Sequence, residues 1–448
     1  MSTHVEVRPG AYADSVALLQ VSREVQQVAG VAAAQVAMAT ALNLEVLAKM
    51  GFDLPASTPN DMVVAIRLDD DAALGAALAA VETALTRRSR STETATEPHR
   101  TTATALLDAP GAIVLVSTPG ASAAVEAMDA LAAGHDVMLF SDNVPVAHEV
   151  ALKTYAAQHG LLVMGPDCGT AVVDGLGLGF ANAVEPGPVG IVAASGTGCQ
   201  QVLCLLDHAG VGVTHALGVG GRDLSAEIGG AATREALRRL DADPAVERIV
   251  VVSKPPAPEV AADLEQYAAG LGTPVSWALL GAGRLDLTAA SEDLLAEKPT
   301  WPVDGQARPS AGPVRGYYVG GTLAAEARQI LDEGAEVIDF GDDEYTRGRA
   351  HPMIDPTLRL ERIAEVGDGV LLLDVVLGHG AEPDPAERLA PAVRAAVERG
   401  VAVVVACVGT RHDPQHRERQ VAALVEVGAE VHLSHAGAAR RALEVSRG

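Results

Sequence analysis

Apolar residues alternate between short runs and amphipathic stretches along most of the chain. From Gly111 onward, short apolar runs without a helical stripe are each followed by a turn and then by residues with helical spacing. Such runs predict buried parallel strands, and the stretches between them predict helices. The expected strands are residues 113–116, 137–140, 161–164, 189–194, 249–252, 316–319, 337–340, 370–376 and 401–408. This pattern predicts doubly wound α/β domains of the Rossmann or flavodoxin-like type, with ligands at the carboxyl ends of the strands.

The first 88 residues follow a different rhythm. Strands at 34–37 and 62–66 and helices at 15–28 and 70–85 predict a small α+β domain of the ferredoxin-like kind, with a regulatory or assembly role. Residues 86–104 have no apolar period and are rich in Ser, Thr and charge, so we expect a flexible linker there. The expected domains are residues 1–88, 105–186, 187–296 and 312–448.

Composition narrows the classes of function. The 448 residues carry a formal net charge of −25, which disfavours nucleic acids and anionic membranes as partners. No run approaches a membrane span and the N-terminus lacks an apolar signal region, so we expect a cytoplasmic protein. Cys168, Cys199, Cys204 and Cys407 lack C-x-x-C spacing, which predicts reduced, buried thiols. We expect no metal site, because His, Asp and Glu in the polar stretch 342–356 lack the helical i, i+4 spacing of ligands.

Two turns between a strand and a helix are candidate phosphate-binding sites. One contains Ser195, Gly196, Thr197 and Gly198, and the other contains Gly320, Gly321 and Thr322. Glycines let backbone N–H groups approach an anion, and the first turn of a helix has N–H groups without internal partners. Each turn could equally be a plain connection between strand and helix. Lys254 follows strand 249–252 and could neutralise a phosphate, or it could be a surface lysine.

The most polar loop of the carboxyl-terminal half, residues 342–356, follows strand 337–340 directly. Arg347, Arg349 and the nearby Arg359 could bind a substrate carboxylate bidentately, and His351 could donate a proton to a leaving group. The alternative is a solvated loop with internal ion pairs, in which His351 caps a helix.

Other polar residues also follow strands. Asp167, Cys168, Gly220, Gly221 and Arg222 are candidates for substrate binding, although Cys168 has no adjacent base and is interpreted as a turn residue. His379 and the triplet at 411–413, Arg-His-Asp, are secondary candidates, since a histidine at the end of a strand is more often structural.

Several motifs occur in the order found in a known family. GPDCGT at 165–170, GPVGIVAASGTG at 187–198 and GVGGRD at 218–223 resemble the α subunit of succinyl-CoA synthetase, from its CoA-binding domain at 105–186 through its ligase domain at 187–296. Residues 314–440, with GGT, VIDFGDD and LLLDVVLGHG, resemble the carboxyl-terminal ligase domain of the β subunit. Without an ATP-grasp domain, and with the leading segments RPGAYADSV and STPNDMVVAIR, the whole chain is similar to FdrA-type acyl-CoA-synthetase-like proteins.

The resemblance implies that the two glycine turns match those that surround a phosphohistidine in succinyl-CoA synthetase. The phosphohistidine motif should fall at residues 279–286, which read LLGAGRLD and contain no histidine. Residues 434–438 imitate that motif in a different domain, and Lys254 stands where the family has a glutamate. The family's glycine-rich nucleotide turn has no counterpart before Gly111, so CoA is a possible ligand that the sequence does not support.

FdrA-type proteins are associated with oxamate carbamoyltransferase, which converts oxalurate and phosphate to oxamate and carbamoyl phosphate in purine (allantoin) catabolism. The resemblance therefore implies a carbamoyltransferase subunit with phosphate as substrate and no required cofactor. It would act in a hetero-oligomeric complex, as a homodimer or larger assembly. Two alternatives stay open: an acyl-CoA synthetase subunit of the succinyl-CoA ligase type that binds CoA, and a non-catalytic scaffold or effector-sensing subunit.

Overall fold

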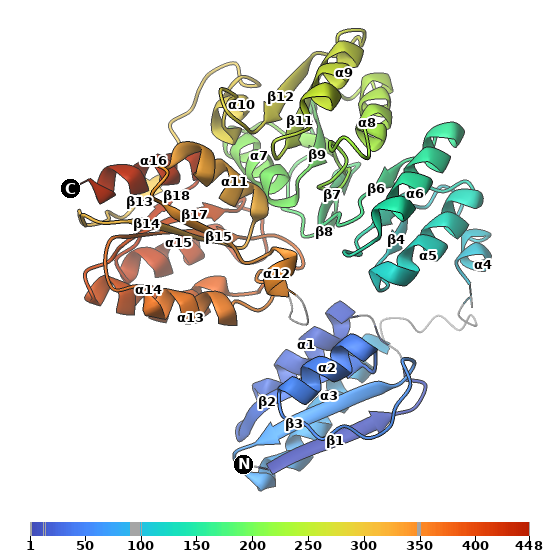
Figure 1. Cartoon of the computed structure of the whole chain (residues 1–448), viewed down its shortest axis with the longest axis vertical. Coiled ribbons are helices and arrows are strands. Elements are labelled where there is room, and N and C mark those ends of the chain that lie inside the picture. Colours follow the sequence, from blue (N-terminus) through green and yellow to red (C-terminus); the bar gives the residue numbers. More distant parts are fainter. Residues whose placement is uncertain are drawn as a thin grey trace. The chain divides into compact units, whose positions relative to one another are not determined.

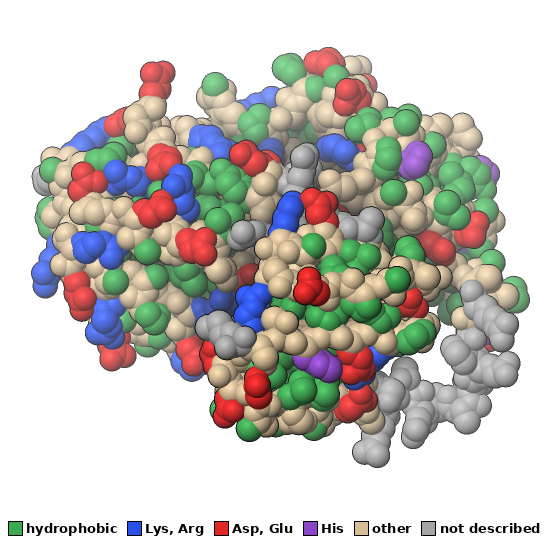
Figure 2. Space-filling view, turned by 60° about the horizontal axis from the view of Figure 1, so that its bottom comes forward, with side chains coloured by type: hydrophobic (Ala, Val, Ile, Leu, Met, Phe, Trp, Pro, Cys, Tyr) green, Lys and Arg blue, Asp and Glu red, His purple; other side chains and the backbone are tan. Residues whose placement is uncertain are grey.

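The computed structural model describes residues 2–11, 13, 15–89, 99, 101–346 and 351–447. The chain divides into two compact units, one up to His99 and one from Thr101 onward (Figure 1). Acidic and basic side chains are interspersed over the face seen in Figure 2, as on an ordinary solvated surface. No helix among the described residues is both long and apolar enough to span a membrane.

The N-terminal unit is a three-stranded antiparallel sheet covered by helices on both faces. The strand order is β1-β3-β2, from Ser2–Arg8, Met62–Leu68 and Val31–Met38. Along β3, Val64 and Ile66 pack against helices α1 (Ser15–Gln26) and α3 (Leu74–Ser89). The alternate residues Val63 and Ala65 pack against α2 (Ala41–Lys49), because successive side chains of a strand point to opposite faces. A 3₁₀ turn, η1 (Asp71–Ala73), precedes α3. Helix α3 takes up the first residues of the predicted linker, and residues 90–98 of that linker lie outside the described residues.

The second unit begins with a three-stranded parallel sheet in the order β4-β5-β6. Its strands are β4 (Val114–Val116), β5 (Val137–Leu139) and β6 (Val163–Met164). Its helices are α4 (Thr102–Leu106), α5 (Gly120–Ala132) and α6 (Val146–His159). This small sheet corresponds to the predicted strands 113–116, 137–140 and 161–164, each shortened by one or two residues.

The second sheet has the order β12-β11-β9-β10-β7-β8. Its strands are β7 (Thr170–Val173), β8 (Leu176–Gly179), β9 (Val189–Ala194), β10 (Val213–Gly218), β11 (Arg248–Ser253) and β12 (Val275–Leu279). Its helices are α7 (Gly196–His208), α8 (Ala231–Ala242), α9 (Pro258–Ala268) and α10 (Leu287–Glu292). Strands β9 to β12 are parallel, whereas β7 and β8 form an antiparallel hairpin at one edge. The last strands of the expected domain 105–186 therefore belong to the sheet of the next domain.

The third sheet has the order β13-β18-β17-β16-β14-β15 and is parallel except for β13. Its strands are β13 (Val303–Asp304), β14 (Val314–Tyr318), β15 (Glu336–Asp339), β16 (Val370–Val376), β17 (Ala402–Val408) and β18 (Glu430–His432). Its helices are α11 (Gly321–Ile330), α12 (Asp343–Thr346), α13 (Thr357–Glu365), α14 (Pro385–Glu398), α15 (Arg417–Glu426) and α16 (His435–Ser446).

One continuous hydrophobic core joins the second and third sheets. Helix α7 lies between the sheets, next to α10 and α11, and residues 197–206 within it are all buried (Figure 1). Leu203 of α7 and Leu323 of α11 belong to the same core as Val404 of β17. The predicted fold class is confirmed: parallel-sheet α/β domains follow a small α+β domain. The shared core holds α7 and α11 at fixed positions relative to each other.

Candidate functional site

The two predicted glycine turns occupy equivalent positions in their sheets. Strand β9 lies between β10 and β11, and β14 lies between β15 and β16, so the strand order reverses beside each of them. In open α/β sheets, ligands bind in the crevice outside the carboxyl ends of the strands at such a reversal. The turn at 195–198 follows β9 and the turn at 320–322 follows β14. Each turn therefore lies where its own sheet would bind a ligand.

The two turns are also in direct contact, although more than a hundred residues separate them. The Ser195 hydroxyl donates a hydrogen bond to Oγ1 of Thr322 at 2.7 Å. The same Ser195 oxygen caps α7 by accepting from the Gly198 N–H at 2.9 Å. A Cβ atom at Gly320 would lie 2.5 Å from Oγ1 of Thr197, so only glycine permits this approach. The N-termini of α7 and α11 consequently meet at one point between the sheets.

Charged side chains surround the start of α11. A Cβ atom at Gly321 would lie 2.6 Å from Nζ of Lys254 and would also press on the Asp339 carboxylate. Burial raises the pKa of Asp339, while the charge of Lys254 acts in the opposite direction. No side chain caps the first turn of α11. The N–H groups of that turn and the Lys254 ammonium are therefore placed to bind an anion.

A buried ion pair holds the second turn from behind. Asp374, fully buried in β16, accepts from the N–H groups of Val319 and Gly320 at 2.9 and 3.1 Å. Arg359 lies 3.1 Å from the Asp374 carboxylate and donates to its backbone carbonyl at 2.7 Å. The Arg359 side chain is buried as well. The structure therefore gives Arg359 a supporting position behind the turn rather than the predicted contact with a substrate carboxylate.

His351 lies close to the turn that follows β15. A Cβ atom at Gly341 would be 2.8 Å from its Nε2 atom, and its ring packs against Phe180 with 6.1 Å between ring centroids. Nδ1 of His351 accepts from the Met353 N–H at 3.2 Å, which leaves the ring proton on Nε2. Burial lowers the pKa of His351 to about 4, so the ring is neutral at pH 7. It can offer a hydrogen bond there but is a weak proton donor. Its expected partners in the polar loop, Arg347 and Arg349, lie outside the described residues.

The candidate residues near 165 and 220 form a junction between α6 and the second sheet. Arg222 donates through Nε to Glu149 of α6 at 3.0 Å, and Lys153 of the same helix binds Glu149 at 2.8 Å and Asp223 at 2.7 Å. Lys153, Glu149 and Asp223 are all buried. A Cβ atom at Gly220 would lie 2.5 Å from the backbone carbonyl oxygen of Pro166, while Gly221 has open space around it. This arrangement gives Arg222 and Gly220 a structural role at a domain junction.

Cys168 is buried in the turn that leads to β7. Its thiol donates to the Thr170 carbonyl oxygen at 3.6 Å, and burial raises its pKa to about 12. A thiol with this pKa is not a nucleophile at neutral pH, in agreement with its interpretation as a turn residue. The neighbouring Asp167 is exposed and has a φ of 56°.

The segment at 434–438, whose sequence resembles the phosphohistidine motif, lies in the core. His435 is 0% exposed, and its two ring nitrogens bind Glu326 and, at 3.1 Å, the Tyr318 hydroxyl. Ser434 caps α16 by accepting from the Gly437 N–H at 2.9 Å. Both ring nitrogens are thus engaged and shielded from solvent, so His435 is a structural histidine.

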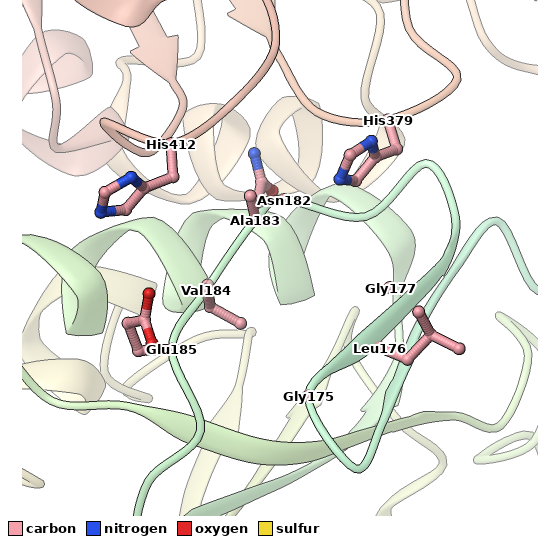
Figure 3. A pocket seen from close by; sticks show the side chains of 9 residues that line it. All are labelled: Gly175, Leu176, Gly177, Asn182, Ala183, Val184, Glu185, His379 and His412. Atoms are coloured by element: carbon pink, nitrogen blue, oxygen red, sulfur yellow. The ribbon is translucent and has the colours of Figure 1, made fainter.

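The secondary candidates His379 and His412 line a different cavity, of about 300 Å³, which shares no residue with the two glycine turns (Figure 3). Asp413, beside His412, is buried and accepts from the N–H groups of Thr410 at 2.7 Å and Ala183 at 2.8 Å. Asp413 therefore fixes the loop that presents His412.

Comparison with known proteins finds matches to two family models and similarity to a relative along nearly the whole chain. A family model described as "CoA-ligase" matches residues 317–445, and one described as "AllF, heavy metal-associated domain" matches residues 1–101. The uncharacterized protein YahF of Escherichia coli strain K12 is 33% identical, over 96% of this chain and 95% of that protein.

Succinate–CoA ligase subunits are more distant relatives. The alpha-2 subunit of Trichomonas vaginalis is 27% identical over 33% of this chain, and the alpha subunit of Methanothermobacter thermautotrophicus is 28% identical over 36%. The chain spans about half the length of these subunits, 47% and 53%. Among solved structures, ATP citrate lyase of Methanothrix soehngenii matches 41% of this chain and 32% of its own, with a TM-score of 0.37 and 19% identity.

The heavy-metal description of the N-terminal match does not fit the residues present. All four cysteines of the chain lie beyond residue 167, so the matched segment contains no thiol. Within the described ranges, no group of three or more His, Cys, Asp or Glu side chains is placed to hold a metal ion. Thiolates are the preferred protein ligands of soft metals and the matched segment has none, so we assign no metal chemistry to this unit.

Proposed function

Since the chain belongs to the family of Escherichia coli YahF and carries a CoA-ligase domain, we propose that it is an enzyme subunit that transfers an acyl group to or from inorganic phosphate. The reaction would take place where the N-termini of α7 and α11 meet. The relatives named as succinate–CoA ligase subunits support this class of reaction. Because they are subunits, we expect this chain to act with partner proteins.

The observation that carries the proposal is the contact between the two turns. Ser195 and Thr322 lie 2.7 Å apart at the start of two helices, and Lys254 stands beside the second helix. Two positive helix ends and an ammonium group form a preorganised environment for phosphate and for the oxyanion that develops at an attacked carbonyl. Such an arrangement stabilises charge without reorganisation during the reaction.

Phosphate itself is the expected nucleophile. A phosphate oxygen would attack the acyl carbonyl, the bond from carbon to the leaving group would break, and the leaving group would depart with a proton. His435 cannot accept the phosphoryl group, because it is buried in the core and its two ring nitrogens are bonded to Glu326 and to the Tyr318 hydroxyl. Transfer would then proceed without a phosphoenzyme.

The three-stranded sheet offers residues that fit CoA. Helices α5 and α6 both begin after a proline and lack a side-chain cap, so their first N–H groups are free for the phosphates of a nucleotide. The Thr118 hydroxyl oxygen at the start of α5 is buried without a hydrogen-bond partner in the described structure. Thr118, Gly120 and the turn at 141–143 would hold the ligand. When bound, CoA would supply the thiol that carries an acyl group as a thioester.

The test is phosphate-dependent release of CoA thiol from acyl-CoA, measured with this chain alone and with the proteins encoded beside it. Gly321→Ala should abolish the activity, because the added methyl group displaces the ends of the Lys254 and Asp339 side chains. Gly334→Ala is the matched control, since nothing lies within 4 Å of its Cβ position. Full turnover in the Gly321→Ala complex would overturn the proposal and favour a scaffold.

Carbamoyl transfer is the second candidate. It uses the same attack of phosphate on a carbonyl. The positive charge of Lys254 beside α11 favours a free phosphate as its neighbour over the imidazole ring of a phosphohistidine. The test is phosphate release from carbamoyl phosphate in the presence of oxamate. Release with oxamate and no turnover of acyl-CoA would select this candidate, and the reverse result would reject it.

A further inference from the structure

Strand β1 forms one edge of the sheet in the N-terminal unit (Figure 1). Among the described residues it pairs with β3 alone, in an unbroken antiparallel register from Ser2 to Arg8. On its outer side, the described part of the chain offers no strand to the backbone N–H and C=O groups of β1. Such an edge is a template for pairing with a strand of another molecule.

The order of elements in this unit leaves a place for one more strand beside β1. Strand β1, helix α1, strands β2 and β3 and helix α3 match the first five elements of a βαββαβ sandwich, with α2 as an insertion. In that arrangement the last strand lies antiparallel to the first, on its outer side. The next described element of this chain, α4, belongs to the second unit instead. A strand from another molecule would therefore complete the sheet.

The opposite edge of the sheet is built differently. Its strand, β2, has a register irregularity between Val31 and Ala33 and contains no charged residue. Irregularities of this kind are one means by which an edge strand avoids pairing with other chains. Strand β1 has no such irregularity, but it contains three residues with charged or ionisable side chains. Whether β1 pairs with another strand therefore depends on how these side chains would be matched.

The polar side chains of β1 match a second copy of β1 in one register. His4, Glu6 and Arg8 share one face of the strand, while Val5 and Val7 lie on the other face and pack against the α2 side of the sheet. In an antiparallel pair that is symmetric about Val5, His4 of each copy faces Glu6 of the other. Symmetry about Glu6 would place two carboxylates opposite each other, and symmetry about His4 would place two imidazoles together. Only the register about Val5 pairs complementary groups.

His4 also has an unused nitrogen at this edge. Its Nε2 atom makes no hydrogen bond within the described residues, and it lies 3.7 Å from Glu6 of its own strand, which is too far for one. We propose that two copies of the chain form a two-fold symmetric dimer, in which their β1 strands pair antiparallel about Val5 and Glu6 of one copy binds His4 of the other. The dimer contact does not involve the two glycine turns, so it stands or falls independently of the proposed reaction.

Introduced cysteines test the register in the full chain, because all four native cysteines are buried. Val5→Cys places two thiols on the symmetry axis, where opposite Cα atoms are about 4.5–5.5 Å apart and within reach of a disulfide. Mild oxidation, stopped with a thiol reagent before denaturation, should convert most of this variant to a covalent dimer. Thr3→Cys is the matched control, since Thr3 would face Val7 of the other copy and its two thiols would lie about 13 Å apart. The double variant Thr3→Cys/Val7→Cys should form the covalent dimer again. No covalent dimer from Val5→Cys, or equal amounts from Thr3→Cys, would overturn the proposal.

Charge variants test the pairing of His4 with Glu6. Sedimentation of the full chain, without an N-terminal tag, should give the mass of two chains at tens of micromolar. Glu6→Lys should raise the dissociation constant of the dimer at least tenfold, and His4→Glu/Glu6→Lys should recover most of the loss, because it restores opposite charges in the same register. Glu45→Lys, at an exposed residue of α2, makes the same change of charge outside β1 and should leave the dimer intact. Melting temperatures show that each variant is folded. A monomeric parent chain, an unchanged dissociation constant in Glu6→Lys, or no recovery in the exchanged pair would contradict the proposed interface.

Discussion

The contact between the two helix N-termini can be tested by adding one methyl group at Gly320. The backbone φ at this position is −121°, so alanine causes no backbone strain there. The new Cβ atom would lie 2.5, 2.6 and 2.7 Å from Oγ1, Cγ2 and Cβ of Thr197. Thr197 is branched and 9% exposed, so it cannot turn away. The two turns would have to separate by about 1 Å to reach ordinary contact distances.

The magnitude follows from two effects. Overpacking of a close-packed site costs about 1–3 kcal/mol. Separation of the turns also breaks the hydrogen bond from Ser195 to Thr322, for about 1 kcal/mol. We expect Gly320→Ala to lower the free energy of unfolding of the second unit by about 2–4 kcal/mol, and its melting temperature by about 3–5 °C, since the unfolding entropy of so large a unit is high.

Denaturant titration and thermal melts of the full chain measure this effect. Gly334→Ala is the control for an added methyl group, because nothing lies near its Cβ position. The double variant Gly320→Ala/Thr197→Ala should recover part of the loss, since two of the three clashing atoms are removed. If Gly320→Ala unfolds at the same midpoint as the parent chain, the turns are not in contact, and the proposed phosphate site has no basis.

The local sequence pattern predicted a strand correctly where the strand consists of one uninterrupted apolar run. Residues 189–194 and 370–376 were expected as strands and are β9 and β16 without any shift. Strand β10 was not expected, because Thr214 and His215 interrupt its apolar run. The β7–β8 hairpin was missed because β8 alternates leucine with glycine, and glycine is unusual inside a strand. Period and composition therefore identify buried strands and miss edge or mixed ones.

The site shows a similar division. Each glycine turn is a local motif and could be predicted, but their meeting depends on packing across the shared core. Arg359 was grouped with a polar loop because its partner lies in a strand. Asp374 is the single charge in the run LLLDVVL, and such a residue needs a buried partner. Lys153 was missed because a lysine on a helix resembles a solvated residue, and its partner Asp223 lies 70 residues further along the chain.

Four further measurements test particular contacts. Because burial lowers the pKa of His351 to about 4, the unfolded chain binds a proton there between pH 6.5 and about 4 that the folded chain does not bind. The free energy of unfolding should therefore fall as the pH falls through this range. In denaturant titrations at pH 6.5 and pH 5, His351→Gln should show a loss that is smaller than that of the parent chain by about 1–2 kcal/mol. Asp374→Asn leaves the buried Arg359 without a counter-charge and should destabilise the second unit by about 3 kcal/mol, as judged from its urea midpoint. All four cysteines are buried, so a thiol reagent should label the native chain negligibly and the urea-unfolded chain at all four cysteines. Rapid labelling of Cys168 in the native chain would contradict the raised pKa of its thiol. Titration with Cu(I) or Zn(II) should show no stoichiometric binding to the N-terminal unit, which has no thiol, and a tight one-to-one complex would show that this unit binds metal through other ligands.

The buried charges of the second unit make sense together as supports for the two helix ends. Asp374, paired with Arg359, holds the turn before α11, and Glu326 on α11 binds the buried His435. On α7, Gln200 and Gln201 donate to the carbonyls of Leu377 and Leu433 at 3.0 and 3.2 Å.

Buried ion pairs are an inefficient source of stability, because desolvation offsets their attraction, and apolar residues of the same volume often stabilise as well. Their value here is positional: they fix the start of α11 and the side of α7 independently of the apolar core. Anion binding by helix N-termini requires such preorganisation, since N–H groups that shift by an ångström lose most of their effect. If position is their role, conservative variants of Gln200 or Glu326 that fold normally should still bind phosphate less tightly than the parent chain. Unchanged phosphate affinity in such variants would show that these contacts serve stability alone.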